Sequence, residues 1–206
     1  VRGSHMSAAV FTPEMKETHT ILIPDMLPVH FKLISSILNQ YGYKTELLRN
    51  DGRSVVDEGL KHVHNDTCYP ALLVIGQFID ALKSGKYDPD KVALLISQTG
   101  GGCRASNYIH LLRKALQKEY PQIPVLSLNF SGLEKGSGFQ ITAPMLYRML
   151  YAVLYGDVLM LTYNECRAYE IHKGDSEKVL NKWLSIIIDK FKNGGFAKTK
   201  RIYRDI

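Results

Sequence analysis

The chain has 206 residues, 45% of them hydrophobic, and a formal net charge of +6 at pH 7. This length fits one domain with an appended lobe. The charge forms no basic stripe interleaved with aromatic residues, which argues against nucleic acid as a partner. Three cysteines, an odd count, argue against a disulfide framework, and no signal peptide is visible, so we expect a cytoplasmic protein.

The first residues of the chain do not resemble part of a folded domain. Residues 2–6, Arg-Gly-Ser-His-Met, resemble the remnant of a cleavable tag, and we set residues 1–6 apart. We expect an α/β sheet lobe over residues 18–132 and a helical extension over residues 133–206 that packs on the same domain. We also expect the chain to be a piece of a longer protein.

Strand and helix patterns alternate along the first half of the chain. An apolar run at 20–24 predicts a strand, and Pro28 opens a helix whose apolar residues recur at helical spacing until Gly42 ends it. A second strand is predicted over 44–48. A polar loop follows, with one helical turn at 54–59.

The alternation continues through residue 130. A helix is predicted from Pro70, capped by Asp66 or Thr67, and strands are predicted over 92–96 and 124–130 with a helix after Cys103 between them. Helices of this length imply right-handed crossovers and therefore a parallel sheet. The sequence predicts an α/β fold with a three-layer, flavodoxin-like parallel sheet and extra C-terminal helices.

The pattern changes after a glycine-punctuated loop at 132–138. A long apolar helix is predicted from Pro144 to about Tyr163, and a last amphipathic helix, capped near Asp175 or Ser176, runs to Gly194. Charged residues interrupt the long helix, so we expect it to pack in protein and predict no contact with a membrane.

The segment Gln98-Thr99-Gly100-Gly101-Gly102-Cys103-Arg104 lies between the third predicted strand and the following helix. In an open α/β sheet this turn lies at the carboxyl edge, where ligands bind. The three glycines allow close backbone approach, and a cysteine at a helix start is favoured as a thiolate. We therefore assign Gly100, Gly101, Gly102 and Arg104 to cofactor or anion binding.

Other glycine-loop functions fit less well. Gly100, Gly102 and Ala105 match a dinucleotide fingerprint, but no acidic residue ends the next predicted strand. No Gly-Lys-Ser/Thr of a Walker loop occurs, and Ile109 stands where a phosphatase loop needs arginine. The loop can still bind a phosphate or carboxylate through its backbone amides.

Cys68 and Cys103 both lie at predicted helix starts, and a parallel sheet brings such starts to one edge. Thiolates are soft ligands that suit iron–sulfur clusters and zinc. Cys166, after the long helix, is a candidate third ligand. His62 and His64 lack the short spacings of zinc sites and are expected to be surface loop residues. Buried, inert cysteines remain the alternative.

Several motifs together resemble a known family. They are Ile23-Pro24-Asp25-Met26-Leu27-Pro28, Val55-Val56-Asp57-Glu58-Gly59-Leu60, His64-Asn65-Asp66-Thr67-Cys68-Tyr69-Pro70-Ala71, the Gln98–Tyr108 segment and Leu128-Asn129-Phe130-Ser131-Gly132-Leu133. The chain resembles the large bacterial activators of (R)-2-hydroxyglutaryl-CoA dehydratase, also described as acyl-CoA dehydratase activase-related proteins. The resemblance covers nearly all of the chain after residue 6.

The resemblance implies one lobe of a dehydratase-like module that works beside an ATP-hydrolysing activase module. In that family three cysteines hold a [4Fe–4S] cluster, which implies Cys68 and Cys103 as ligands. Cys166 fits less well, since Ala168 replaces a proline of its motif, so a third ligand is expected outside the chain. The ATPase motifs are missing, and no ATPase activity is expected from this chain alone.

These observations predict a lobe that contributes cysteine ligands to an iron–sulfur cluster used in electron transfer to an acyl-CoA. The expected partners are the remaining domains of the full-length protein, including the activase module, and acyl-CoA. Two alternatives stay open. One is a metal-free module that binds an anion or acyl-CoA, and the other is a structural docking domain of a larger protein.

Overall fold

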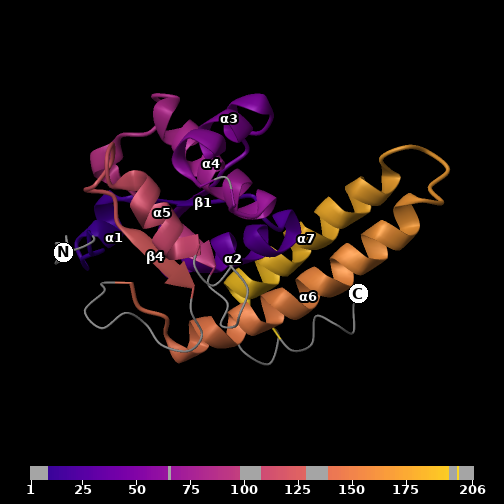
Figure 1. Cartoon of the computed structure of the whole chain (residues 1–206). Coiled ribbons are helices and arrows are strands. Elements are labelled where there is room, and N and C mark those ends of the chain that lie inside the picture. Colours follow the sequence, from indigo (N-terminus) through magenta and orange to yellow (C-terminus); the bar gives the residue numbers. More distant parts are fainter. Residues whose placement is uncertain (1–8, 65, 98–107, 129–138, 195–198, 200–206) are drawn as a thin grey trace. The chain divides into compact units, whose positions relative to one another are not determined.

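The computed structural model describes residues 9–64, 66–97, 108–128, 139–194 and 199 (Figure 1). Its elements in chain order are α1 (Met15–Thr18), β1 (Thr20–Ile23), α2 (Pro28–Gln40), β2 (Lys44–Leu47), α3 (Arg53–His62), α4 (Tyr69–Lys83), the 3-10 turn η1 (Pro89–Lys91), β3 (Val92–Ser97), α5 (Tyr108–Leu116), β4 (Val125–Leu128), α6 (Ala143–Arg167) and α7 (Asp175–Asn193).

The four strands form one parallel sheet in the order β2-β1-β3-β4. Thr20 of β1 lies opposite Lys44 of β2 on one side and Val92 of β3 on the other. The chain therefore steps from β1 to β2 and then crosses back over β1 to β3, as in the flavodoxin-like order. The predicted α/β fold with a parallel sheet is confirmed.

The chain divides into two compact units, one of Val1–Met26 with Tyr43–Gln140 and one of Leu27–Gly42 with Ile141–Ile206. In the first unit β3 is buried along almost its whole length, as expected of a central parallel strand. One apolar core joins strand residues to α4 and α5, and includes Leu94, Ile75 and Leu112. The sheet and these two helices hold the loops at its carboxyl edge.

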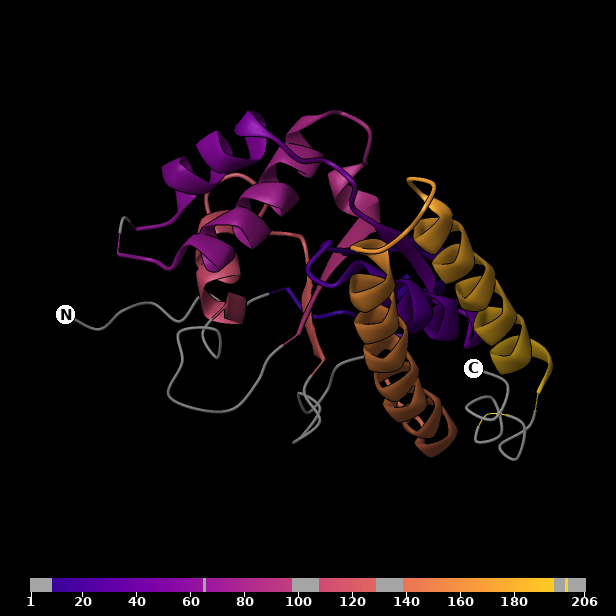
Figure 2. The same cartoon turned by 90° about the vertical axis from the view of Figure 1, so that its right-hand side faces the viewer.

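In the second unit α6 and α7 lie side by side, and α2 packs against both (Figures 1 and 2). The Nε2 atom of buried His30 on α2 lies 2.9 Å from Oδ1 of Asp157 on α6. A Cβ atom on Gly156 would lie 2.5 Å from the His30 ring, so the imidazole can occupy this position only because residue 156 has no side chain. Arg148 of α6 donates to the Tyr41 hydroxyl and to the Gly194 carbonyl.

Three local predictions were wrong. The single turn expected at 54–59 is the full helix α3, because Gly59 weakens the helical pattern in the sequence but lies where α3 crosses α4. Cys68, rather than Asp66 or Thr67, is the N-cap of α4. Gly174 is the N-cap of α7, with φ +97°, and the Glu170 carboxylate accepts hydrogen bonds from its first amides.

Candidate functional site

The carboxyl edge of the sheet is organised by side chains that follow β1 and β2. The Asp25 amide, just past β1, donates to Oε1 of Gln77 on α4 at 2.9 Å. The Gln77 amide group donates to the Asn50 carbonyl at 2.9 Å, and Asn50 Nδ2 donates back to the Gln77 carbonyl and to Oδ2 of Asp80. These bonds tie both loops to α4, so the edge is built as one unit.

A cavity of about 550 Å³ opens beside this network, lined by Asp25, Asn50, Tyr69, Leu73 and Gln77 among others. Its remaining lining residues come from the loop after β2 and from α3: Asp51, Gly52, Arg53, Val55, Val56, Asp57 and, from α4, Val74. The rim is therefore more acidic than basic. It is poorly suited to bind an anion.

Asp25 has an unusual environment within the described part of the chain. Its Oδ1 atom is buried with no hydrogen-bond partner, while Oδ2 lies 3.4 Å from the exposed guanidinium of Arg49. A buried carboxylate oxygen normally has a partner. The sequence alone did not point to Asp25, Asn50 and Gln77 as edge residues; the available signal was that Asp25 and Asn50 are polar and stand two or three positions after the ends of β1 and β2.

Cys68 lies at the start of α4, as the sequence predicted, and the structure shows it partly buried. Because α4 runs back to the start of β3, its first residues lie at the carboxyl edge. The Cys68 Sγ atom is 3.6 Å from the hydroxyl of Tyr108, the first residue of α5. The starts of α4 and α5 are therefore adjacent at this thiol.

The other predicted site residues of this edge are Gly100, Gly101, Gly102, Cys103 and Arg104. All five lie outside the described residues, so their assignments stay predictions. Cys166 is exposed near the end of α6 and belongs to the second unit, whereas Cys68 belongs to the first. Over the described ranges, no three histidine, cysteine, aspartate or glutamate side chains gather as a metal site would require.

Cys68, at the carboxyl edge of the sheet, nevertheless has the type of side chain that binds iron–sulfur clusters. A cysteine thiolate is the usual ligand of such clusters, and the N-terminal end of a helix stabilises negative charge. Cys68 occupies such a helix start in α4. The described residues supply this one thiol, and a complete ligand set depends on Cys103 and on a third donor.

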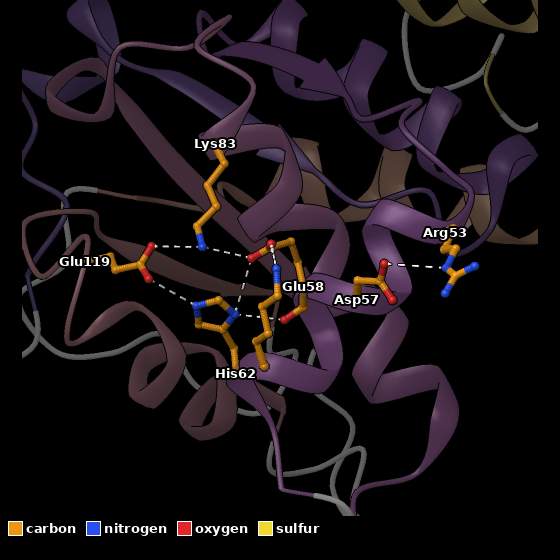
Figure 3. Close-up of polar contacts among 7 residues, drawn as sticks. Arg53, Asp57, Glu58, His62, Lys83 and Glu119 are labelled. Carbon is orange, nitrogen blue, oxygen red and sulfur yellow. Dashed lines mark hydrogen bonds and ion pairs between the residues drawn. The ribbon is translucent and has the colours of Figure 1, made fainter.

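A second polar cluster joins α3, α4 and the turn after α5 (Figure 3). Oε2 of Glu58 lies 2.8 Å from Nζ of Lys83, and Lys83 also lies 3.3 Å from Oε2 of Glu119. His62 directs Nδ1 to the Glu58 carbonyl at 2.8 Å and Nε2 to Oε1 of Glu119 at 3.4 Å. His62 thus ends a helix and is mostly buried, contrary to the expected surface loop.

The ion pairs of this cluster shift the pKa values of its members. Hydrogen bonds from Lys61 and Lys83 lower the pKa of Glu58 to about 2, against the opposing effect of burial. The bond to Glu58 in turn raises the pKa of Lys83. Lys83 ends α4 and Glu119 follows α5, so the cluster lies where these helices lead to the starts of strands. Ligands of parallel sheets bind at the opposite edge, so this cluster is an ion-pair network that holds helices together.

Comparison with known proteins found no family model, no curated protein and no solved structure that matches this chain. The family resemblance therefore rests on the sequence motifs alone.

Proposed function

We propose that this chain is an α/β lobe that contributes Cys68 and Cys103 as ligands to an iron–sulfur cluster, of the [4Fe–4S] type, for electron transfer to an acyl-CoA. The proposal includes the expected partners, namely the remaining domains of a longer protein with an activase module that hydrolyses ATP. We expect no ATPase activity from this chain alone.

One observation supports the proposal most directly, the 3.6 Å contact between the Cys68 thiol and the Tyr108 hydroxyl. Tyr108 stands five positions after Cys103 in the sequence, at the head of the helix that follows the glycine-rich segment. The contact brings the start of α4 beside the start of α5. The contact supports a joint site for Cys68 and Cys103, which are 35 positions apart in the sequence.

The residues of this chain would have separate tasks. Cys68 and Cys103 would bind iron as thiolates, and the position of Cys68 at the start of α4 favours the thiolate form. The Tyr108 hydroxyl can donate a hydrogen bond to the Cys68 sulfur, an interaction of the kind that tunes cluster potential. Arg104 and the amides of Gly100 to Gly102 would offset negative charge. When bound, the cluster supplies one-electron transfer.

Anaerobic reconstitution with ferrous iron and sulfide tests the proposal. We expect the chain to take up both and to gain broad visible absorption, and Cys68→Ser and Cys103→Ser each to lose most of this uptake, because a hard hydroxyl replaces a soft thiolate. Cys166→Ser is the matched control, expected to behave like the unmodified chain because its motif departs from the family pattern.

The outcomes separate the possibilities. Loss of uptake in Cys166→Ser equal to that of the other two variants would mean that all three ligands lie in this chain. Iron uptake by the Cys68→Ser, Cys103→Ser double variant equal to that of the unmodified chain would refute the proposal.

A metal-free module for an anion or acyl-CoA is the second candidate, and it depends on the backbone amides of Gly100 to Gly102. The cavity beside Asp25 gives it no support, because Asp25, Asp51 and Asp57 outnumber Arg53 around it.

A further inference from the structure

Helix α2 has a polar side that faces α7, the helix against which it packs in the second unit. The polar residues of this side recur at intervals of three and four positions, and they are Lys32, Ser35, Ser36, Asn39 and Gln40. Residues at such intervals follow one side of a helix. Nζ of Lys32 lies 3.4 Å from Oδ1 of Asn181 on α7, so this side is turned toward α7. Helices of a packed unit normally turn apolar side chains toward each other, and the polar side is therefore unusual.

A cavity of about 420 Å³ opens between α2 and α7 along this side. All five polar residues of α2 line it, together with Ile188 and Lys192 of α7. Ser35 is only 8% exposed and Lys32 is half-buried, so the cavity reaches below the surface of the unit. Its volume lies in the range of small-molecule sites, about 300–1,000 Å³. Among the described residues of the lining, Ile188 alone is apolar, which argues against an apolar ligand.

The lining of this cavity is positively charged. Lys32 and Lys192 contribute to it, and none of the described lining residues is acidic. Helix α2 contains no acidic residue. Asp189, the acidic residue of α7 closest in sequence to the cavity, accepts a hydrogen bond from Asn193. Two positive charges without an acidic residue in the lining favour a negatively charged ligand.

The hydrogen-bonding groups of the lining indicate what kind of anion fits. They are two ammonium groups, two hydroxyl groups and two side-chain amides, and each of them can donate hydrogen bonds. A phosphoryl group carries a negative charge and presents three acceptor oxygens, and lysine is a common ligand of phosphate in proteins. A lining of this composition therefore suits phosphoryl groups.

The two lysines lie toward opposite ends of the cavity. Asn181, the contact of Lys32, stands eleven positions before Lys192 on α7, and eleven residue steps of a helix span about 16 Å. Flexible lysine side chains shorten this separation. A single phosphate is still too small to contact both ammonium groups, whereas an elongated ligand with two or more phosphoryl groups can do so.

We propose that this cavity binds a soluble ligand that carries two or more phosphoryl groups. Lys32 and Lys192 contact different phosphoryl groups, and the side chains of Ser36, Asn39 and Gln40 donate hydrogen bonds to the oxygens between them. The site belongs to the second unit, whereas Cys68 belongs to the first. It is therefore independent of the proposed iron–sulfur cluster.

Isothermal titration calorimetry with inorganic tripolyphosphate tests the site. We expect a Kd below about 1 mM, and binding of inorganic phosphate that is weaker by roughly tenfold or more because it reaches only one lysine. Lys32→Gln and Lys192→Gln should each raise the Kd for tripolyphosphate about tenfold, since each removes a charged donor. Lys182→Gln is the matched control: Lys182 is an exposed lysine of α7 outside the lining, and its loss should change the Kd less than about twofold.

Thermal denaturation without ligand establishes that each variant is folded. This matters most for Lys192, because a cation in the last turn of α7 also stabilises the helix. Phosphoryl groups occur both on soluble molecules and on lipid headgroups. Flotation with phosphatidylcholine vesicles that contain phosphatidylinositol bisphosphate separates the two sources, and we expect the chain not to float with them.

Three results would overturn the proposal. The first is no binding of tripolyphosphate up to about 5 mM. The second is a loss of affinity in Lys182→Gln equal to that in Lys32→Gln, which would show general attraction to a positively charged chain. The third is flotation with the vesicles that Lys32→Gln abolishes, which would identify a lipid headgroup as the ligand.

Discussion

Replacing Gly76 by alanine would force apart the two helices α3 and α4. A Cβ atom at Gly76 would lie 2.0 Å from the Val55 carbonyl oxygen and 2.9 Å from the Gly59 amide nitrogen. Ordinary contact begins at 3.4 Å, so the helices would have to separate by about 1.4 Å. Both obstructing atoms belong to the backbone, and neither can rotate away as a side chain would.

The magnitude follows from two opposing effects. Alanine is favoured over glycine inside a helix by about 1 kcal/mol. Overpacking typically costs about 1–3 kcal/mol, and here the upper end applies because a whole helix has to move and its dispersion contacts weaken. We expect a net loss of about 2 kcal/mol in the free energy of unfolding and a fall in Tm of roughly 4–8 °C.

Urea denaturation followed by circular dichroism measures this loss. Gly156→Ala is a second overpacked variant, in the second unit: its Cβ would lie 2.5 Å from the ring of buried His30, and moving that ring would break its bond to Asp157, so a loss of similar size is expected. Gly59→Ala meets the Leu72 carbonyl at 2.5 Å, and because it separates the same helices, the double variant with Gly76→Ala should lose less than the sum. Gly76→Ala as stable as the unmodified chain would refute the close crossing.

Two further predictions concern single polar groups. The pKa of Glu58 is lowered to about 2 from 4.5, so the stability that its carboxylate contributes is complete above pH 4.5 and is lost as pH falls toward 2. Glu58→Gln should lower the free energy of unfolding by up to about 3 kcal/mol at pH 7 and make it depend less on pH between 4.5 and 2. A pH dependence of stability equal to that of the unmodified chain would contradict the network. Asp157→Ala leaves Nε2 of buried His30 without its partner and should lower the free energy of unfolding by about 1–3 kcal/mol. Asp157→Asn keeps an oxygen that can accept the hydrogen bond, so its loss of stability should be smaller. Equal losses in the two variants would show that this hydrogen bond contributes nothing to stability.

The strands could be predicted because their chemistry is local. Continuous apolar runs such as Val92–Ile96 are typical of buried parallel strands, and the helix lengths between them imply crossovers on a parallel sheet. The position of Cys68 at a helix start at the carboxyl edge followed from the same reasoning, and the structure has it there. Hydrophobic periodicity and chain direction carry this information without knowledge of distant contacts.

Other features depended on contacts between residues far apart in sequence, which no local pattern encodes. Gly59 weakens a helical pattern in isolation, yet it permits α3 to cross α4 at Gly76, so the length of α3 was underestimated. The contact of Cys68 with Tyr108 and the burial of His62 beside Glu119 arise in the same way.

The grouping of α2 with α6 and α7 is likewise a tertiary effect. The sequence shows only an amphipathic helix after β1, and many apolar surfaces could cover its buried face. In the structure His30 fits over Gly156 and reaches Asp157, 127 positions away. The sequence by itself determined which segments are strands and helices and the direction in which they run. The tertiary structure decided which faces meet, because shape complementarity at a glycine and pairing of a buried polar atom exist only once the two segments are in contact.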